Sequence, residues 1–278
     1  MDQSEFVYTP ETNILYALGI GEDEDLKYLY ECSEGFTFFP TFCILPSIKA
    51  LIDFDTHQTH LARLKIPFDV SRLLHGEQFI EFYAPLPQNE NKFITKPPHM
   101  VELLDKGSNT VVITENNTYS QNGKLLCRNQ TCCMIIGSGG WNGPRTTTNK
   151  LVENIVDIPK RQPDKVAEQV THVNQAALYR LSGDRNPLHI DPRFAQAGGY
   201  SKPILHGLCS LGFAARHVIK SYPDERVVRL KARFSGVIYP GETIVTSMWR
   251  EGDRVHFQCS VKETNKIIIT GAYIDLNK

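Results

Sequence analysis

Residues 179–213 read YRLSGDRNPLHIDPRFAQAGGYSKPILHGLCSLGF, and this stretch gathers two Asp, one Asn and two His residues among prolines. Asp184 and His189 are five residues apart, with Asn186 and a proline between them. Because a proline disfavours helix for the residue before it, the chain turns here and both side chains can face one cavity. The segment therefore predicts a compact active site.

A helical pattern follows directly after this turn. Small or apolar residues recur at helical spacing, namely Leu208, Leu211, Gly212, Ala215 and Val218. We therefore expect Gly207 to lie in the first turn of a helix. The backbone N–H groups of a first turn have no partner within the helix, and they can bind an anion. Gly207 is thus a candidate for stabilising negative charge.

The charge and the hydrophobic pattern exclude several classes of protein. The 278 residues include 30 basic and 31 acidic ones, so no long-range field would capture nucleic acid or an acidic membrane. No apolar run approaches the roughly 18 residues of a membrane span, and the acidic start is unlike a signal peptide. Seven cysteines without paired CxxC spacing suggest neither a disulfide framework nor a zinc site. We expect a soluble, intracellular protein with no nucleic-acid partner and no membrane insertion.

Two strand-rich regions, 79–136 and 229–275, organise the chain. Each is preceded by one helix-compatible stretch that opens with proline, at Pro40 and at Pro203. Hairpin turns are expected at residues 122–123 and 251–253. Residues 137–150 are rich in Gly, Thr and Asn, which favours a connector over a dinucleotide-binding loop because no helix follows. The same plan of a helix and a sheet therefore occurs twice.

The active-site segment resembles the catalytic motif of the (R)-specific 2-enoyl-CoA hydratases, or hydratase 2, in the MaoC-like branch of the hot-dog superfamily. Further stretches resemble eukaryotic members in the same order: LHGEQFIEFYAPLP at 74–87, DKGS at 105–108, GSGG at 137–140 and KARF at 231–234. The resemblance spans nearly the whole chain. It extends to the hydratase part of the eukaryotic peroxisomal multifunctional enzymes of type 2.

The resemblance implies an α+β double hot-dog fold, in which two antiparallel sheets are each wrapped around a helix. This arrangement lets sheet and helix bury their apolar sides together. We expect a non-catalytic N-terminal hot-dog domain at 1–136, a linker at 137–165 and a catalytic MaoC-like domain at 166–278. Only the second half carries the D-x-N-P-x-H pattern, so one active site per chain is expected.

Hydration of a 2-enoyl thioester needs a base near the water, a proton for C2 and stabilisation of charge on the thioester oxygen. Asp184 and His189 can perform the acid–base work, and Asn186 can orient the water or the pair. The N–H of Gly207 can bind the enolate-like oxygen. The resemblance implies the same roles. Which residue protonates C2 is left open.

Contacts with acyl-CoA are implied by the resemblance alone for His75, Gly76, Lys106 and Phe234. Read by chemistry alone, Lys106 could be a solvated turn residue, Phe234 a core aromatic and His75 a capping residue. We predict no metal, although His189 with Asp191 could suggest one, because the other histidines show no ligand spacing.

Two residues have a structural interpretation beside a catalytic one. Asp184 could be part of the acid–base pair, or it could merely cap a turn. His206 could be either a structural residue before the helix or part of the site.

The residues and the resemblance together predict an enoyl-CoA hydratase that acts reversibly on trans-2-enoyl-CoA. The (R) specificity, with (3R)-3-hydroxyacyl-CoA as the product in β-oxidation, is what the resemblance implies. No cofactor is expected beyond the coenzyme A that the substrate carries. The alternatives are an acyl-CoA thioesterase and a non-catalytic acyl-CoA-binding protein. The resemblance also implies a homodimer, a peroxisomal location and possible membership of a larger multifunctional chain, although no SKL-type signal ends this sequence.

Overall fold

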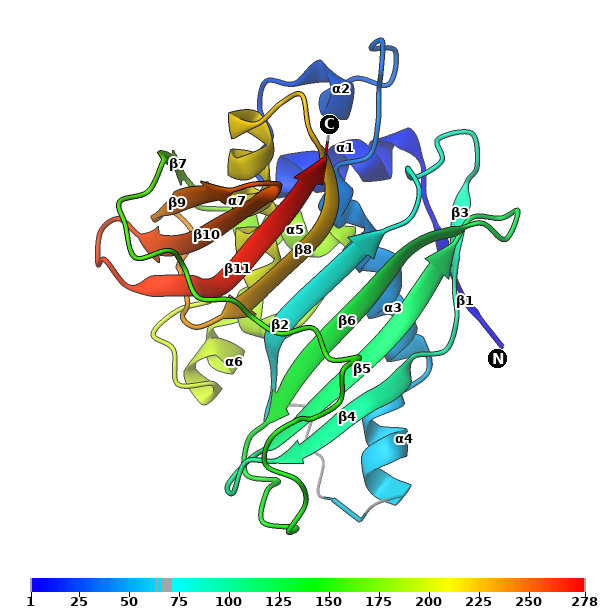
Figure 1. Ribbon diagram of the computed structural model, residues 1–278, viewed down its shortest axis with the longest axis vertical. Coiled ribbons are helices and arrows are strands. Elements are labelled where there is room, and N and C mark those ends of the chain that lie inside the picture. Colours follow the sequence, from blue (N-terminus) through cyan, green and yellow to red (C-terminus); the bar gives the residue numbers. More distant parts are fainter. Residues whose placement is uncertain (1, 64, 67–71, 278) are drawn as a thin grey trace. The chain divides into compact units, whose positions relative to one another are not determined.

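The computed structural model describes residues 2–63, 65–66 and 72–277, which form two compact units (Figure 1). The first unit comprises Met1–Val7 and Pro46–Ile155, and the second comprises Tyr8–Leu45 and Val156–Lys278. Each unit contains one antiparallel sheet and a helix packed on it. None of the described helices combines the length and the hydrophobicity that a membrane span requires.

The sheet of the first unit is antiparallel in the order β1-β3-β5-β6-β2, and β4 also pairs with β5. Helix α3 packs on this sheet, where the Ser47 hydroxyl donates to the Asn116 side chain at 2.8 Å. The elements are β1 (Ser4–Val7), α3 (Ile44–Asp53), α4 (Thr56–Arg63), β2 (Leu73–Phe82), β3 (Lys92–Thr95), β4 (His99–Asp105), β5 (Thr110–Tyr119) and β6 (Leu125–Ile135).

The sheet of the second unit is antiparallel in the order β8-β11-β10-β9-β7. Helix α7 packs against it and contacts β7, β8, β9 and β11. Its strands are β7 (Lys165–Val170), β8 (Arg226–Phe234), β9 (Thr243–Glu251), β10 (Arg254–Val261) and β11 (Ile267–Asn277). Its helices are α1 (Pro10–Gly19), α2 (Leu26–Leu29), η1 (Pro40–Cys43), α5 (Gln175–Tyr179), η3 (Arg180–Ser182), η4 (Pro187–His189), α6 (Pro192–Ala197) and α7 (Gly207–Ser221).

Residues 8–45 pack with the second unit because the end of α1 lies directly on α7. A Cβ atom at Gly212 would come within 2.3 Å of the Ile20 side chain, so only glycine permits this approach. The Cys209 thiol donates to the Gly19 carbonyl at 3.2 Å. The predicted domain boundaries at residues 136 and 166 stay a prediction. The compact units are discontinuous in the sequence, because α1, near the N-terminus, packs against α7 in the second unit.

A buried ion pair joins the same two segments. Glu22 and Arg216 are both buried, and Arg216 Nη1 lies 3.7 Å from Glu22 Oε1. Lys220 reaches the same carboxylate at 3.1 Å. Glu22 Oε1 also accepts the backbone N–H groups of residues 23–25. A carboxylate that is buried in this way needs these partners, so the chain after α1 is tied firmly to α7.

The predicted strand regions and hairpins are confirmed. Gly123 joins β5 to β6 with a φ of 78°, and Gly252 joins β9 to β10 with a φ of 60°, values that favour glycine. The helical stretch predicted from Pro40 begins as η1 and continues as α3. Strands β1 and β7 were not predicted, because neither Ser4–Val7 nor Lys165–Val170 carries a clear pattern of β-branched residues.

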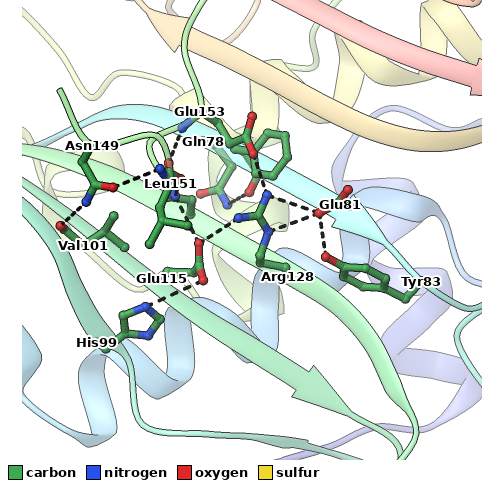
Figure 2. Close-up of polar contacts among 12 residues, drawn as sticks. Gln78, Glu81, Tyr83, His99, Val101, Glu115, Arg128, Asn149, Leu151 and Glu153 are labelled. Carbon is green, nitrogen blue, oxygen red and sulfur yellow. Dashed lines mark hydrogen bonds and ion pairs between the residues drawn. The ribbon is translucent and has the colours of Figure 1, made fainter. Parts of the chain in front are cut away.

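The first part of the predicted linker is fixed to the first unit. Arg128 on β6 pairs with Glu81 at 3.2 Å, with Glu115 at 3.1 Å and with Glu153 at 2.6 Å (Figure 2). The Gln130 amide donates to the Leu151 carbonyl at 2.9 Å. Glu81, Glu115 and Arg128 belong to three neighbouring strands, so the chain near residues 151–153 lies across the face of this sheet.

The close approach of α1 to α7 yields a test of the fold. Alanine usually stabilises a helix interior relative to glycine by about 0.5–1 kcal/mol. At Gly212 the new methyl group would collide with Ile20, so we expect Gly212→Ala to lower the free energy of unfolding by about 1–3 kcal/mol. Urea unfolding measures the change. Adding Ile20→Ala should relieve part of the loss, and a stabilising Gly212→Ala would refute this packing.

Candidate active site

Asp184 and Asn186 lie on a loop between η3 and η4 in the second unit. Gly183 ends η3 with a φ of 143°, which lets the chain turn toward Asp184. The Asp184 carboxylate accepts the Asn186 N–H at 3.2 Å, and the Asn186 side chain accepts the Leu188 N–H at 3.0 Å. Each side chain therefore holds the backbone two residues further on, which shapes the loop. Asp184 is half-buried and Asn186 is exposed.

His189 is held by its backbone neighbour across the site. Its Nδ1 lies 2.9 Å from the Ile204 carbonyl oxygen. A carbonyl oxygen only accepts hydrogen bonds, so Nδ1 carries the proton. Burial lowers the pKa of His189, while the charge of Asp184 and the bond to Ile204 act in the opposite direction. The ring is neutral at pH 7, and its Nε2 keeps a lone pair that can accept a proton.

His206 lies beside this pair. Its ring stacks on that of His189, with centroids 3.7 Å apart and planes 28° apart. Its Nε2 lies 3.2 Å from the Asp184 carbonyl oxygen. Burial, followed by the neighbouring His189, lowers the pKa of His206 to about 3. The site therefore combines two neutral imidazoles with one carboxylate.

Among the residues that the structure describes, the same carboxylate and two imidazoles form the one cluster that could hold a metal ion. Asp184, His189 and His206 bring one ligand atom each within 4.8 Å of one another. Two imidazoles and a carboxylate suit zinc chemistry. Asp191, which the sequence suggested as a ligand, instead accepts the Arg193 N–H at 2.9 Å and caps α6. The absence of a metal stays a prediction.

Gly207 is the first residue of α7, as predicted, and it is exposed while its neighbours are buried. No side chain within the described ranges caps this helix, and its first internal bond runs from the Ser210 N–H to the His206 carbonyl at 3.1 Å. The Gly207 N–H therefore precedes the helical bonding and can serve a ligand. Phe234 packs beside it, since a Cβ at Gly207 would lie 3.1 Å from that ring.

The other predicted substrate residues lie in the first unit. His75 and Gly76 belong to β2, at an irregularity in its pairing with β6. Lys106 follows β4, and its ammonium group donates to the Arg145 carbonyl. Asp105 anchors the same loop by accepting the N–H groups of Gly107, Gly140 and Asn142. The assignment of His75, Gly76 and Lys106 to acyl-CoA binding stays a prediction.

Sequence reasoning did not assign Tyr179, and it left His206 open. Tyr179 is buried, with its ring centroid 4.9 Å from that of His206 and 6.1 Å from that of Tyr16. Burial raises the pKa of the Tyr179 hydroxyl well above its usual value. Their positions in the sequence could have pointed to the site, because Tyr179 begins the active-site segment and His206 directly precedes Gly207. Spacing alone cannot tell that the two rings stack.

Family comparisons cover almost the whole chain. Residues 6–137 match the family described as the MFE-2 hydratase 2 N-terminal domain, and residues 154–272 match the MaoC like domain. The peroxisomal multifunctional enzyme type 2 of Mus musculus is 44% identical over 278 residues, which are 97% of this chain and 36% of that protein. "Enoyl-CoA hydratase 2, peroxisomal" of Arabidopsis thaliana is 38% identical, and the match covers 99% of this chain and 92% of that protein. The chain spans less than half the length of the multifunctional enzymes it matches, 36% in mouse and 46% in Drosophila melanogaster.

Solved structures agree in fold. A MaoC-like dehydratase from Phytophthora Capsici has a TM-score of 0.85 at 34% identity, covering 100% of this chain and 96% of that one. Full-length peroxisomal multifunctional enzyme type 2 from Drosophila melanogaster has a TM-score of 0.84 at 38% identity, covering 99% of this chain and 48% of that one. A Mycobacterium tuberculosis protein described as a double hotdog shares the fold at 12% identity, with a TM-score of 0.57. The predicted double hot-dog fold is confirmed, and the chain belongs to the hydratase 2 family, with an MFE-2 hydratase 2 N-terminal domain followed by a MaoC-like domain.

Proposed function

We propose that the protein is an (R)-specific 2-enoyl-CoA hydratase, which adds water reversibly to trans-2-enoyl-CoA and forms (3R)-3-hydroxyacyl-CoA. One observation carries the proposal: the carboxylate of Asp184 and the neutral ring of His189 converge in the unit whose helix α7 begins at Gly207. The relatives named "Enoyl-CoA hydratase 2, peroxisomal" in Arabidopsis thaliana and "Probable enoyl-CoA hydratase 2" in Dictyostelium discoideum support hydration of enoyl-CoA.

The reaction places three demands on these residues. Asp184 and the Nε2 lone pair of His189 hold a water molecule and take its proton as the oxygen adds to C3. Negative charge then develops on the thioester oxygen, where the Gly207 N–H and the positive end of α7 stabilise it. One proton is delivered to C2, so the acid–base pair ends the cycle in its starting state. Asn186 orients the water or the pair.

The first test removes the acid–base pair. We expect Asp184→Asn and His189→Ala to reduce kcat by about 10²–10⁴-fold, because each variant lacks one of the two groups that activate water. The assay follows trans-2-decenoyl-CoA with coupling to (3R)-specific and (3S)-specific 3-hydroxyacyl-CoA dehydrogenases, while free thiol is monitored. His172→Ala, at an exposed position of the same unit, is the matched control.

Three outcomes of this assay would overturn parts of the proposal. Near-wild-type turnover of both variants would refute the assignment of Asp184 and His189. If the wild-type protein releases thiol without hydrating the substrate, it is a thioesterase. If it binds the acyl-CoA without any turnover, it is a carrier. We propose that no metal or redox cofactor takes part in the reaction. Treatment of the protein with EDTA before the assay should therefore leave turnover unchanged. A loss of turnover that added zinc restores would contradict this.

A second test isolates the backbone donor at Gly207. Proline is tolerated at the first position of a helix and lacks an N–H, and His206 already has the extended backbone that precedes proline, with φ −60° and ψ 136°. Gly207→Ala adds the same Cβ beside Phe234 but keeps the donor. We expect Gly207→Pro to lower kcat about 10²–10³-fold below Gly207→Ala. Equal rates for the two variants would rule out the oxyanion role.

We also propose that the chain acts as a homodimer in peroxisomal β-oxidation. The relatives named peroxisomal support the location. The dimer rests on the family resemblance, and the edge strand β7, with Val166 and Val170 exposed, offers apolar surface for association. Light scattering after size-exclusion chromatography should give the mass of two chains. The mass of one chain at micromolar concentration would contradict the dimer.

A further inference from the structure

The loop that carries Asp184 needs an anchor outside itself. Among the described residues, the hydrogen bonds within this loop join close neighbours, for example Asn186 N–H to the Asp184 side chain and Leu188 N–H to the Asn186 side chain. Such local bonds shape a turn but do not fix where the turn lies relative to α7. The hydrogen bond from His206 Nε2 to the Asp184 carbonyl, at 3.2 Å, crosses 22 residues of sequence and joins the loop to α7.

The backbone of His206 is itself fixed. Its carbonyl accepts the Ser210 N–H at 3.1 Å and the Ser210 hydroxyl at 3.3 Å. Ser210 lies in the first turns of α7, where residues 208–219 are all buried. The backbone of His206 is therefore held by α7, and its ring contacts Asp184 and His189 from that fixed point.

A second contact of the same ring controls His189. The two imidazoles stack with centroids 3.7 Å apart, while His189 Nδ1 bonds to the Ile204 carbonyl at 2.9 Å. The hydrogen bond fixes one ring nitrogen of His189, and the stack fixes the plane of the ring. With both in place, Nε2 of His189 points in a single direction.

The burial of the second ring nitrogen of His206, Nδ1, is evidence against a direct role of this residue in proton transfer. Nε2 carries a proton because it faces a carbonyl oxygen, so Nδ1 holds the lone pair. Nδ1 is completely shielded from solvent and has no hydrogen-bond partner within the described residues. A water molecule that reaches Asp184, which is half-exposed, has no access to this atom.

We propose that His206 is a positioning residue for the hydration reaction: it holds the Asp184 loop by hydrogen bonding and the His189 ring by stacking, both in register with the start of α7. The role as a positioning residue for hydration rests on the proposed function, whereas the structural coupling of the three residues does not. His206 acts through Asp184 and His189 and does not touch the reacting atoms.

Two substitutions separate the two contacts. His206→Phe keeps an aromatic ring against His189 but removes the donor to Asp184. His206→Gln keeps an N–H near the position of Nε2 but removes the stack. We expect each variant to lower kcat by about tenfold to 100-fold with a KM within about threefold of wild type, because misplacement of catalytic groups acts on turnover. In a His189→Ala background, neither substitution should cause a comparable further loss, since residues that act as a unit are not additive.

Measurements on the free protein test the coupling without any turnover. In His206→Phe, hydrogen exchange of the 183–190 segment should accelerate by up to about tenfold, the value of one lost hydrogen bond. In His206→Gln, ¹⁵N spectra should show a weaker preference of His189 for the Nδ1–H tautomer, because a ring without the stack can tilt and misalign Nδ1 with the Ile204 carbonyl. His172→Phe and His172→Gln, at an exposed position, should change neither signal.

The outcomes are distinct. Unchanged exchange and an unchanged His189 tautomer would overturn the proposal, whatever the protein catalyses. If both signals change but the wild-type protein hydrates no enoyl-CoA, the coupling stands and the proposed function fails. If His206→Phe and His206→Gln are both as inactive as His189→Ala while exchange and tautomer stay wild type, His206 is a proton-transfer residue and the positioning role is wrong.

Discussion

The burial of α7 is the constraint on which the rest of the second unit depends. Residues 208–219 of this helix are buried, with the sheet against it and the end of α1 packed on it. A helix enclosed in this way cannot shift along its axis without breaking many contacts at once. Its first residue, Gly207, therefore has a fixed place, and so does the N–H that it offers. The buried pair of Glu22 and Arg216 adds a polar restraint to the same packing.

The proposed acid–base groups lie beside the start of this helix. His206 precedes it and contacts both Asp184 and His189, which lie on a segment of short 3₁₀ turns and loop. Irregular segments of this kind are suited to catalysis when a rigid element holds them. Burial also keeps both imidazoles neutral, as the lowered pKa values of His189 and His206 indicate. A neutral His189 with its proton on Nδ1 is the form that can accept a proton from water.

Sequence reasoning reached the repeated helix and sheet, the hairpins at Gly123 and Gly252, and the position of Gly207, because these features depend on local patterns. It brought Asp184 and His189 together because a proline turn lies between them. It did not find the packing of α1 on α7, since contacts between Ile20 and Gly212 leave no trace in periodicity. The stacking of His206 on His189 was likewise out of reach, because it depends on where the chain returns after 17 residues.

The proposed function requires a thioester to bind with its oxygen at the Gly207 N–H and its C3 beside Asp184 and His189. The most direct measurement is a crystal structure of the Asp184→Asn variant with trans-2-decenoyl-CoA bound. We expect the thioester oxygen to lie within hydrogen-bond distance of Gly207 N, and C3 to face Asn at position 184 and the Nε2 of His189. A thioester bound elsewhere, or one whose oxygen points away from the start of α7, would contradict it.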